Sequence, residues 1–226
     1  CSMFSAALAN ISRLYPETAQ DNLCYIQRLI DTVMSPELRA YDTNRWGEDA
    51  LETLHGNESH ISYISHLAWM ICGYKSVGGD DRYDAVLSKL CDTMNRRILS
   101  SSSLNLPTYP GESIYVPDML VAIVALKQYS QMTDNLYSST VDKWLARAQH
   151  EWLDDESELL VSFLGADGTQ YTDAPVKGSY SALNCYYLTL IDTTFANEQY
   201  RLLKKHLWRD NFIPGLCEYK EWTPVF

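Results

Sequence analysis

Carboxylates that precede or open apolar helices are the groups in this sequence best suited to acid–base chemistry. Asp118 follows Val116-Pro117 at the start of the apolar run MLVAIVALKQY. A proline in the first helical turn costs no hydrogen bond, and the helix dipole there favours a carboxylate. Glu112 lies just upstream, in a turn-rich segment that contains Gly111. Two carboxylates held across a pocket would supply a general acid and a general base, as in glycosidases.

Histidine supplies the third catalytic candidate. His60 opens another apolar run, and an imidazole can act as a base near neutral pH. His66 lies six residues further on, so the two histidines do not share a helix face and do not form a ready metal pair. Tyr63 and His66 are three residues apart and do share a face. Structural interpretations stay open beside these roles: Asp118 as a helix-terminus residue, Glu112 as a solvated loop residue and each histidine as a packed core residue.

A larger group of aromatic and polar side chains is expected to bind substrate. The starts of parallel inner helices, and the loops that lead into them, would converge at one end of the molecule. The expected substrate-binding residues are Trp46, Tyr63, His66, Tyr109, Tyr115, Tyr171, Asp173, Tyr180 and Asn184. The residues expected to line one shared pocket are His60, Tyr63, Tyr115, Asp118, Tyr171 and Tyr180. Such an aromatic, hydrogen-bonding cup would suit a polyol or a small alcohol.

The cysteines and glycines do not indicate a cofactor. The six cysteines include no CxxC pair, so no zinc site is predicted, and no glycine-rich phosphate loop followed by Gly-Lys occurs. We therefore expect chemistry without a metal, a nucleotide or another cofactor. Cys72 and Cys91 lie in helical patterns and should be buried, whereas Cys185 and Cys217 lie nearer polar positions and could be reactive.

The composition is that of a globular protein with an acidic surface. The chain has 226 residues, is 46% hydrophobic and carries a net charge of −11, which disfavours nucleic acid as a partner. No run of about eighteen apolar residues occurs, so no transmembrane helix is predicted. The chain begins at Cys1, and a mature bacterial lipoprotein begins at a lipidated cysteine. A fragment boundary explains Cys1 equally well.

Helical periodicity dominates the chain, with a weak repeat of roughly 55 to 65 residues. Each unit is a polar loop, an apolar helix, a tight turn and an amphipathic helix. The apolar helices begin at His60, Pro117 and Tyr180, and the amphipathic helices carry Tyr83, Tyr137 and Tyr200 near their starts. Two further helices come first, over 3–15 and from 16 to about 34, and residues 41–57 read as polar and irregular. An apolar inner layer under an amphipathic outer layer predicts an all-α protein of helical hairpins.

These patterns also predict burial and strand content. Val121, Val124 and Ala125 should be buried because their helix is apolar on nearly every face. Lys89, Arg147 and Lys204 should be exposed on the polar faces of amphipathic helices. One short β-hairpin is expected near residues 159–170, turning at the segment from Gly165 to Gly168.

The order of helices, with PTYPGESIYVPD and LLVSFLGADGTQYTD between them, resembles the α/α-toroid superfamily. That superfamily includes glycoside hydrolases, polysaccharide lyases, uronyl epimerases and linalool dehydratase-isomerases. The run GGDDRYDAVLSKL…LNLPTYPGESIYVPDMLVAIVAL is most similar to uncharacterised bacterial lipoproteins related to the last group. The resemblance covers residues 59–208 and implies a toroid, or an incomplete arc of about four hairpins where a whole toroid has about six. No catalytic assignment is transferred, because the family's motif is not matched residue by residue.

The residues and the resemblance lead to one main functional hypothesis. We expect a single toroid-like domain over 1–226, or a piece of a larger toroid, acting as an enzyme of the bacterial envelope. It would be a periplasmic or outer-membrane lipoprotein of hydrolase or lyase/isomerase type, acting on a carbohydrate or a small neutral alcohol. The alternatives are a non-catalytic module that binds a glycan or a protein, and a structural lipoprotein. A lipid anchor at Cys1 and a homo-oligomer are consistent with all three.

Two outcomes in the main pocket would separate these hypotheses. Two acids within about 5 to 10 Å of each other across an open cleft would favour glycoside hydrolysis. One isolated acid among tyrosine and tryptophan rings would favour binding without catalysis.

Overall fold

The computed structural model describes residues 1–171, 175–210 and 214–220, and these are chiefly helical, as predicted. The helices are α1 (Ser2–Leu14), α2 (Ala19–Met34), α3 (Pro36–Trp46), α4 (Ile61–Ser76), α5 (Asp84–Ser100), α6 (Val116–Met132), α7 (Ser138–Glu151), α8 (Gly178–Thr189) and α9 (Thr193–Leu207). A 3-10 turn, η1 (Pro16–Thr18), joins α1 to α2. Within the described ranges, no helix is both long enough and apolar enough to cross a membrane.

Helix α3 corrects the prediction of irregular structure for residues 41–46, whereas residues 47–57 contain no helix or strand, as predicted. The Ser35-Pro36 pair that ends α2 also starts α3, because the Ser35 hydroxyl accepts a hydrogen bond from the Leu38 N–H and Pro36 suits the first turn. The helix ends at Gly47, whose φ of 81° is the left-handed conformation that glycine adopts readily. Its sequence, PELRAYDTNRW, is polar, so no apolar periodicity marked it as a helix.

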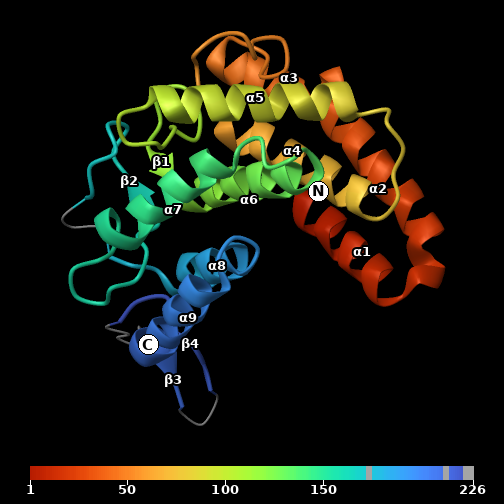
Figure 1. The fold of residues 1–226 in the computed structure, drawn as a ribbon. Coiled ribbons are helices and arrows are strands. Elements are labelled where there is room, and N and C mark those ends of the chain that lie inside the picture. Colours follow the sequence, from red (N-terminus) through yellow and green to blue (C-terminus); the bar gives the residue numbers. More distant parts are fainter. Residues whose placement is uncertain (172–174, 211–213, 221–226) are drawn as a thin grey trace.

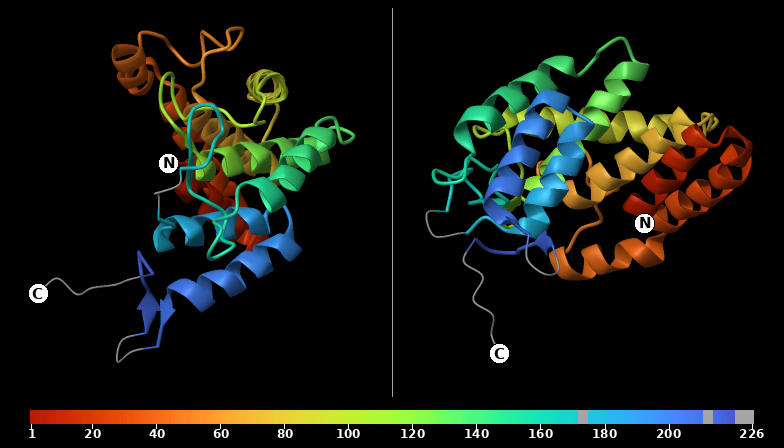
Figure 2. Two further views of the ribbon diagram at one scale, coloured as in Figure 1. Left: turned by 90° about the vertical axis from the view of Figure 1, so that its left-hand side faces the viewer. Right: turned by 90° about the horizontal axis from the view of Figure 1, so that it is seen from below.

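The helices pack as consecutive pairs around α4 and α6. The pairs α1–α2, α4–α5, α6–α7 and α8–α9 are each in contact; α4 also contacts α1 and α6, and α6 contacts α8. Figure 1 shows α5 on one side of α4 and α6, with α1 and α8 on the other side. Figure 2 shows these helices from two further sides, and the hydroxyl of Tyr187 on α8 hydrogen-bonds the sulfur of Met3 on α1 at 3.5 Å. Helices α4 and α6 are therefore covered on several sides, which explains why they are apolar on nearly every face.

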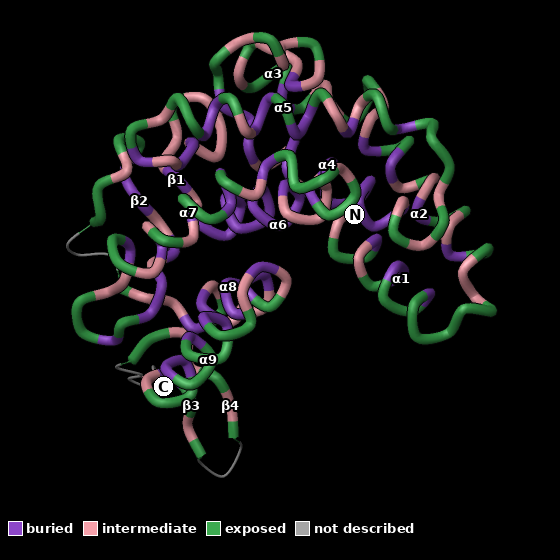
Figure 3. Tube along the Cα trace, in the orientation of Figure 1, coloured by how far each residue is buried: buried purple, intermediate pink, exposed green. Residues whose placement is uncertain are grey.

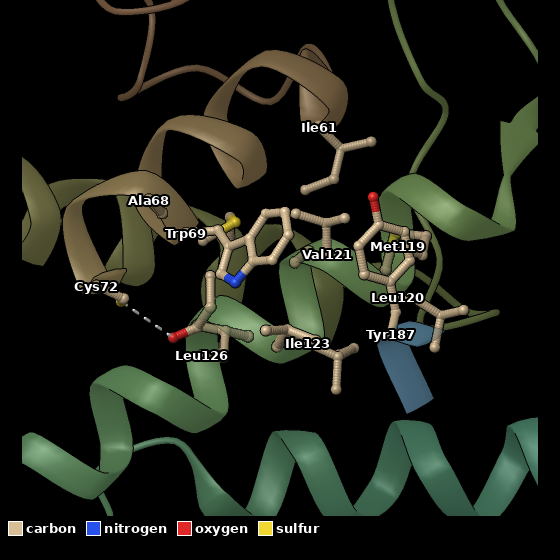
Figure 4. Close-up of a cluster of buried hydrophobic side chains, with 14 of the residues drawn as sticks. Ile61, Ala68, Trp69, Cys72, Met119, Leu120, Val121, Ile123, Leu126 and Tyr187 are labelled. Carbon is tan, nitrogen blue, oxygen red and sulfur yellow. Dashed lines mark hydrogen bonds between the residues drawn. The ribbon is translucent and has the colours of Figure 1, made fainter. Parts of the chain in front are cut away.

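The core follows these two central helices. Every residue from Met119 to Leu126 is fully buried, which confirms the burial predicted for Val121, Val124 and Ala125. Figure 3 shows the buried segments concentrated in α4 and α6, and Figure 4 shows Trp69 of α4 beside Val121 and Leu126 of α6. One cluster of buried residues extends from Leu8 to Ala196.

Two of the three predicted exposed residues are exposed. Lys89 and Lys204 lie on the surface, as predicted. The prediction for Arg147 was wrong, because this side chain is half-buried. Its guanidinium donates a hydrogen bond to the Ser102 carbonyl at 2.7 Å and lies over the Trp152 ring at 5.6 Å. A long side chain can cover apolar surface in this way even on a polar helix face.

The strand prediction was correct in location but wrong in partner. Strand β2 (Phe163–Leu164) lies in the predicted segment, and Leu164 also forms an isolated bridge with Gln170. Its partner, however, is β1 (Ile114–Tyr115), with Tyr115 opposite Phe163. A further pair, β3 (Trp208–Arg209) with β4 (Gly215–Leu216), was not predicted. Periodicity within one segment cannot reveal a partner far away in the chain. The β1–β2 pair holds the backbone that leads directly into α6 and Asp118.

Candidate functional site

Three side chains from three helices lie in a row at the start of α6, joined by one hydrogen bond and one close contact. Asp118 lies in the first turn of α6 and is 6% exposed. Its Oδ1 lies 3.4 Å from Nε2 of His66, which belongs to α4. The other ring nitrogen of His66, Nδ1, lies 2.8 Å from the hydroxyl of Ser2, the first residue of α1. We call Ser2, His66 and Asp118 the relay.

The charge of Asp118 contributes to the raised pKa of three tyrosine phenols. Burial raises the pKa of Tyr115, and the nearby Tyr180 phenol and Asp118 carboxylate raise it further. Burial also raises the pKa of Tyr187, with Asp118 as the next cause. Burial raises the pKa of Tyr109 to about 12, with a smaller contribution from Asp118. All three phenols therefore stay protonated at neutral pH and can donate hydrogen bonds.

An open pocket of about 590 Å³ lies between the loop before α6, strand β2 and the start of α8. Its lining residues are Thr108, Gly111, Glu112, Ser113, Tyr115, Phe163 and Tyr180. We call it the aromatic pocket, because the ring of Tyr115 lies 5.0 Å from that of Phe163 and 5.3 Å from that of Tyr180. The Tyr171 hydroxyl hydrogen-bonds the Ser113 hydroxyl at 2.7 Å, which places Tyr171 at the rim.

Glu112 is the one carboxylate among the described lining residues of the aromatic pocket. It lies 3.4 Å from the Arg45 guanidinium, which in turn lies over the Trp46 ring. The pair is solvent-exposed, so the attraction is screened and contributes little to stability. Glu112 can therefore exchange Arg45 for a polar group of a ligand.

His60 lies in a different cluster, beneath α3. Its side chain is fully buried, and Nε2 lies 2.8 Å from Glu48 Oε1. Beside it, the ring of Trp46 stacks on that of Tyr109 at 3.9 Å, and the Tyr63 hydroxyl donates to the Val33 carbonyl at 2.9 Å. The ring stack joins α3 to the loop before α6, and the hydrogen bond of Tyr63 joins α4 to the end of α2.

The cluster beneath α3 contains a buried carboxylate, Asp42, with an oxygen that has no hydrogen-bond partner among the described residues. Asp42 Oδ2 and His60 Nδ1 are buried and find no hydrogen-bond partner among the described residues. Burial raises the pKa of Asp42, and the nearby His60 opposes that shift. Ring packing of Trp46 against His60, at 6.2 Å between centroids, joins α3 to the start of α4.

The structure divides the six residues that were expected to line one pocket. Tyr115 and Tyr180 meet in the aromatic pocket and Tyr171 lies at its rim, whereas His60 and Tyr63 belong to the cluster beneath α3. Asp118 is not among the pocket's described lining residues, although its charge contributes to the raised pKa of Tyr115, which is. The reason is local: the residues before α4 turn toward α3, a helix that the sequence did not reveal.

The remaining predicted residues have separate placements. Trp46 and Tyr109 stack on each other, and His66 belongs to the relay. Asn184 is 1% exposed, and its amide donates to the Leu160 carbonyl at 3.3 Å, so it ties α8 to the segment before β2. Asp173 lies outside the described residues.

The cysteines do not join the relay or the aromatic pocket. Cys72 and Cys91 are buried, as predicted. The sequence left open that Cys185 could be reactive, but it is 7% exposed, and burial raises the pKa of its thiol to about 11. A buried, protonated thiol is a poor nucleophile, so burial argues against that reactivity.

Three residues of the site were missed by sequence reasoning. Ser2 contacts a residue 64 positions away, a separation that no local pattern reveals. Phe163 lay within the predicted hairpin but had no predicted partner on β1. Tyr187 follows Tyr180 by seven residues on one helix, so both lie on the same face, and this spacing could have identified it.

The relay can move protons, and the aromatic pocket can hold a neutral ring or chain. A histidine between a carboxylate and a hydroxyl is the arrangement that general acid–base and nucleophilic catalysis use. Among the described residues, no group of three or more histidine, cysteine, aspartate or glutamate side chains could hold a metal ion. Comparison of the chain with protein-family models finds no match, and comparison with curated proteins finds none.

Proposed function

We propose that this chain is an enzyme that uses acid–base chemistry, of hydrolase or lyase/isomerase type, on a carbohydrate or a small neutral alcohol. The observation that carries the proposal is the His66–Asp118 pair, in which a nearly buried carboxylate lies 3.4 Å from an imidazole that is partly open to solvent. A carboxylate in that position can orient the imidazole, so that His66 can accept and return a proton.

Tyr115 connects the pair to a binding surface. Its ring forms a wall of the aromatic pocket, and its phenol lies within the electrostatic reach of Asp118. Aromatic walls favour the apolar faces of sugars and small alcohols, while Thr108 and Ser113 offer hydroxyl groups to the ligand. A protonated Tyr115 would donate a hydrogen bond to a substrate oxygen at the end nearest Asp118.

We further propose that the helix pairs form an arc of an α/α toroid. The support is the contact within α1–α2, α4–α5, α6–α7 and α8–α9, together with the resemblance of residues 59–208. The proposed location in the bacterial envelope, as a lipoprotein, rests on the resemblance alone.

A specific observation favours a second function, a non-catalytic glycan-binding module. The aromatic pocket presents one carboxylate, Glu112, among three aromatic rings. A second acid across the pocket, which an inverting or retaining glycosidase requires, is not among its described lining residues. The two functions differ in whether Asp118 takes part in turnover.

The experiment compares wild type with Asp118→Asn and Tyr180→Ala on a panel of glycosides, sugar esters and small alcohols. Conversion is followed by NMR and binding by ligand-observed NMR. If Asp118 supports catalysis, Asp118→Asn keeps the melting temperature and ligand binding but loses roughly two to four decades in rate. Tyr180→Ala should weaken binding in both wild-type and Asp118→Asn backgrounds, because it removes a wall of the pocket.

The same variants also test the second function, in which the chain binds a glycan without converting it. In that case wild type binds without converting any ligand, and Asp118→Asn only lowers stability, by about 0.5 to 2 kcal/mol, as expected for the loss of a helix-terminus charge. Equal turnover by wild type and Asp118→Asn would contradict the enzymatic role of the pair.

A further inference from the structure

We infer that Ser2 is a nucleophile and that the relay cleaves a carboxylic ester of a neutral alcohol through an acyl-enzyme. The inference rests on the proposed acid–base role of His66 and Asp118 and selects the hydrolase branch of that proposal. The observation that carries it is the hydrogen bond between the Ser2 hydroxyl and His66 Nδ1, on the side of the ring opposite Asp118.

The geometry of the relay fits nucleophilic catalysis. The Ser2 hydroxyl lies 2.8 Å from His66 Nδ1, and His66 Nε2 lies 3.4 Å from Asp118 Oδ1. With a proton on Nε2 directed to Asp118, Nδ1 is free to accept the proton of Ser2. This tautomer uses the two ring nitrogens in the reverse order of the familiar serine-protease triad, and the chemistry requires only that one nitrogen faces the acid and the other the hydroxyl.

Solvent access changes along the relay in the direction that catalysis needs. The Asp118 side chain is 8% exposed and the His66 side chain is 26% exposed. Ser2 is half-buried at the surface end. A buried acid holds the imidazole in place, and an accessible hydroxyl can meet a substrate.

The position of Ser2 at the start of α1 provides backbone N–H donors for the oxyanion that forms when Ser2 attacks an ester carbonyl. The first N–H groups of a helix have no partner within the helix, and no side chain among the described residues caps α1. The N–H groups of Met3 and Phe4 lie in the same first turn as the Ser2 hydroxyl. Such donors, at the positive end of the helix dipole, stabilise an oxyanion that forms next to the nucleophile.

The reaction balances with water as the second reactant. Ser2 Oγ attacks the ester carbonyl carbon while its proton passes to His66 Nδ1. The C–O bond to the alcohol breaks, the alcohol leaves with that proton, and the acyl group stays on Ser2 as an ester. Water then attacks this ester with His66 as base, the bond to Ser2 Oγ breaks, and the proton returns to Ser2. One ester and one water become one acid and one alcohol, with no redox change.

The test is covalent labelling with a fluorophosphonate probe, followed by peptide mass spectrometry, on wild type, Ser2→Ala, His66→Ala and Ser5→Ala. Ser5 is the matched control, since it lies one turn along α1 and its buried hydroxyl finds no partner among the described residues. We expect wild type and Ser5→Ala to be labelled on Ser2, and Ser2→Ala and His66→Ala to lose at least about tenfold of the labelling and of p-nitrophenyl acetate hydrolysis. Circular dichroism melting confirms that each variant is folded.

The outcomes separate this inference from the function on which it rests. Folded wild type that is not labelled, or Ser2→Ala that is labelled as strongly as wild type, overturns the nucleophile. If Ser2→Ala keeps turnover of a panel substrate that Asp118→Asn no longer converts, the nucleophile is wrong and the acid–base function stands. If Asp118→Asn keeps that turnover as well, the proposed function fails together with the inference.

Discussion

At the scale of single residues, the cysteines separate by burial rather than by the polarity of their sequence neighbours. Cys24 is exposed, whereas burial raises the pKa of the Cys185 thiol to about 11. Because only the thiolate reacts, we expect Cys185 to be alkylated by iodoacetamide at pH 8 at least about a hundredfold more slowly than Cys24. Peptide mass spectrometry after brief labelling measures both rates. Unfolding in guanidinium should make them equal, and equal rates in the folded protein would contradict the placement of Cys185.

At the scale of helices, α5 and α7 are anchored in the same way. Each begins after a tyrosine, Tyr83 or Tyr137, whose hydroxyl donates to an aspartate of an earlier helix, Asp31 of α2 or Asp92 of α5. We expect Tyr83→Phe and Tyr137→Phe each to lower the free energy of unfolding by about 1.5 to 3 kcal/mol, the range for a hydrogen bond to a charged group. Tyr200→Phe is the control, because Tyr200 is 55% exposed and should change little.

Chemical denaturation of the three variants measures these differences, and a loss for Tyr200→Phe equal to the other two would contradict the anchoring role.

The stability that the Tyr83 and Tyr137 hydroxyls contribute also depends on pH. Burial raises the pKa of Tyr83 and of Tyr137 above the ordinary value of about 10. Both hydroxyls therefore contribute fully below about pH 10, and their contribution is lost as the pH rises above it.

At the scale of the whole molecule, α6 is the most enclosed element. Its residues from Met119 to Leu126 are fully buried, and the helix contacts α4, α5, α7 and α8. Its amides should therefore exchange with solvent only when the whole structure unfolds. We expect hydrogen-exchange mass spectrometry to find the strongest protection over residues 119–128. Exchange in α6 as fast as in α1, whose Phe4 and Leu14 are exposed, would contradict its central position.

The sequence by itself determined the helices, most of their ends and the residues of the core. Apolar spacing, Pro117 in the first turn of α6 and the turn residues between helices act within a few positions along the chain, so they can be recognised without the fold. The same reasoning identified Asp118 and His66 as candidate site residues. The seven-residue spacing from Tyr180 could have identified Tyr187 as a further candidate. Sequence reasoning missed α3, since a polar helix held by its caps and by contacts to α2 has no apolar period.

Only the tertiary structure decided how these residues meet. It paired β1 with β2, turned His60 toward Glu48 and brought the Ser2 hydroxyl to His66. Each of these contacts joins segments whose separation in space depends on how α1, α3, α4 and α6 cross. The energy that sets those crossings comes from burial summed over many side chains, so no pattern within one segment contains it.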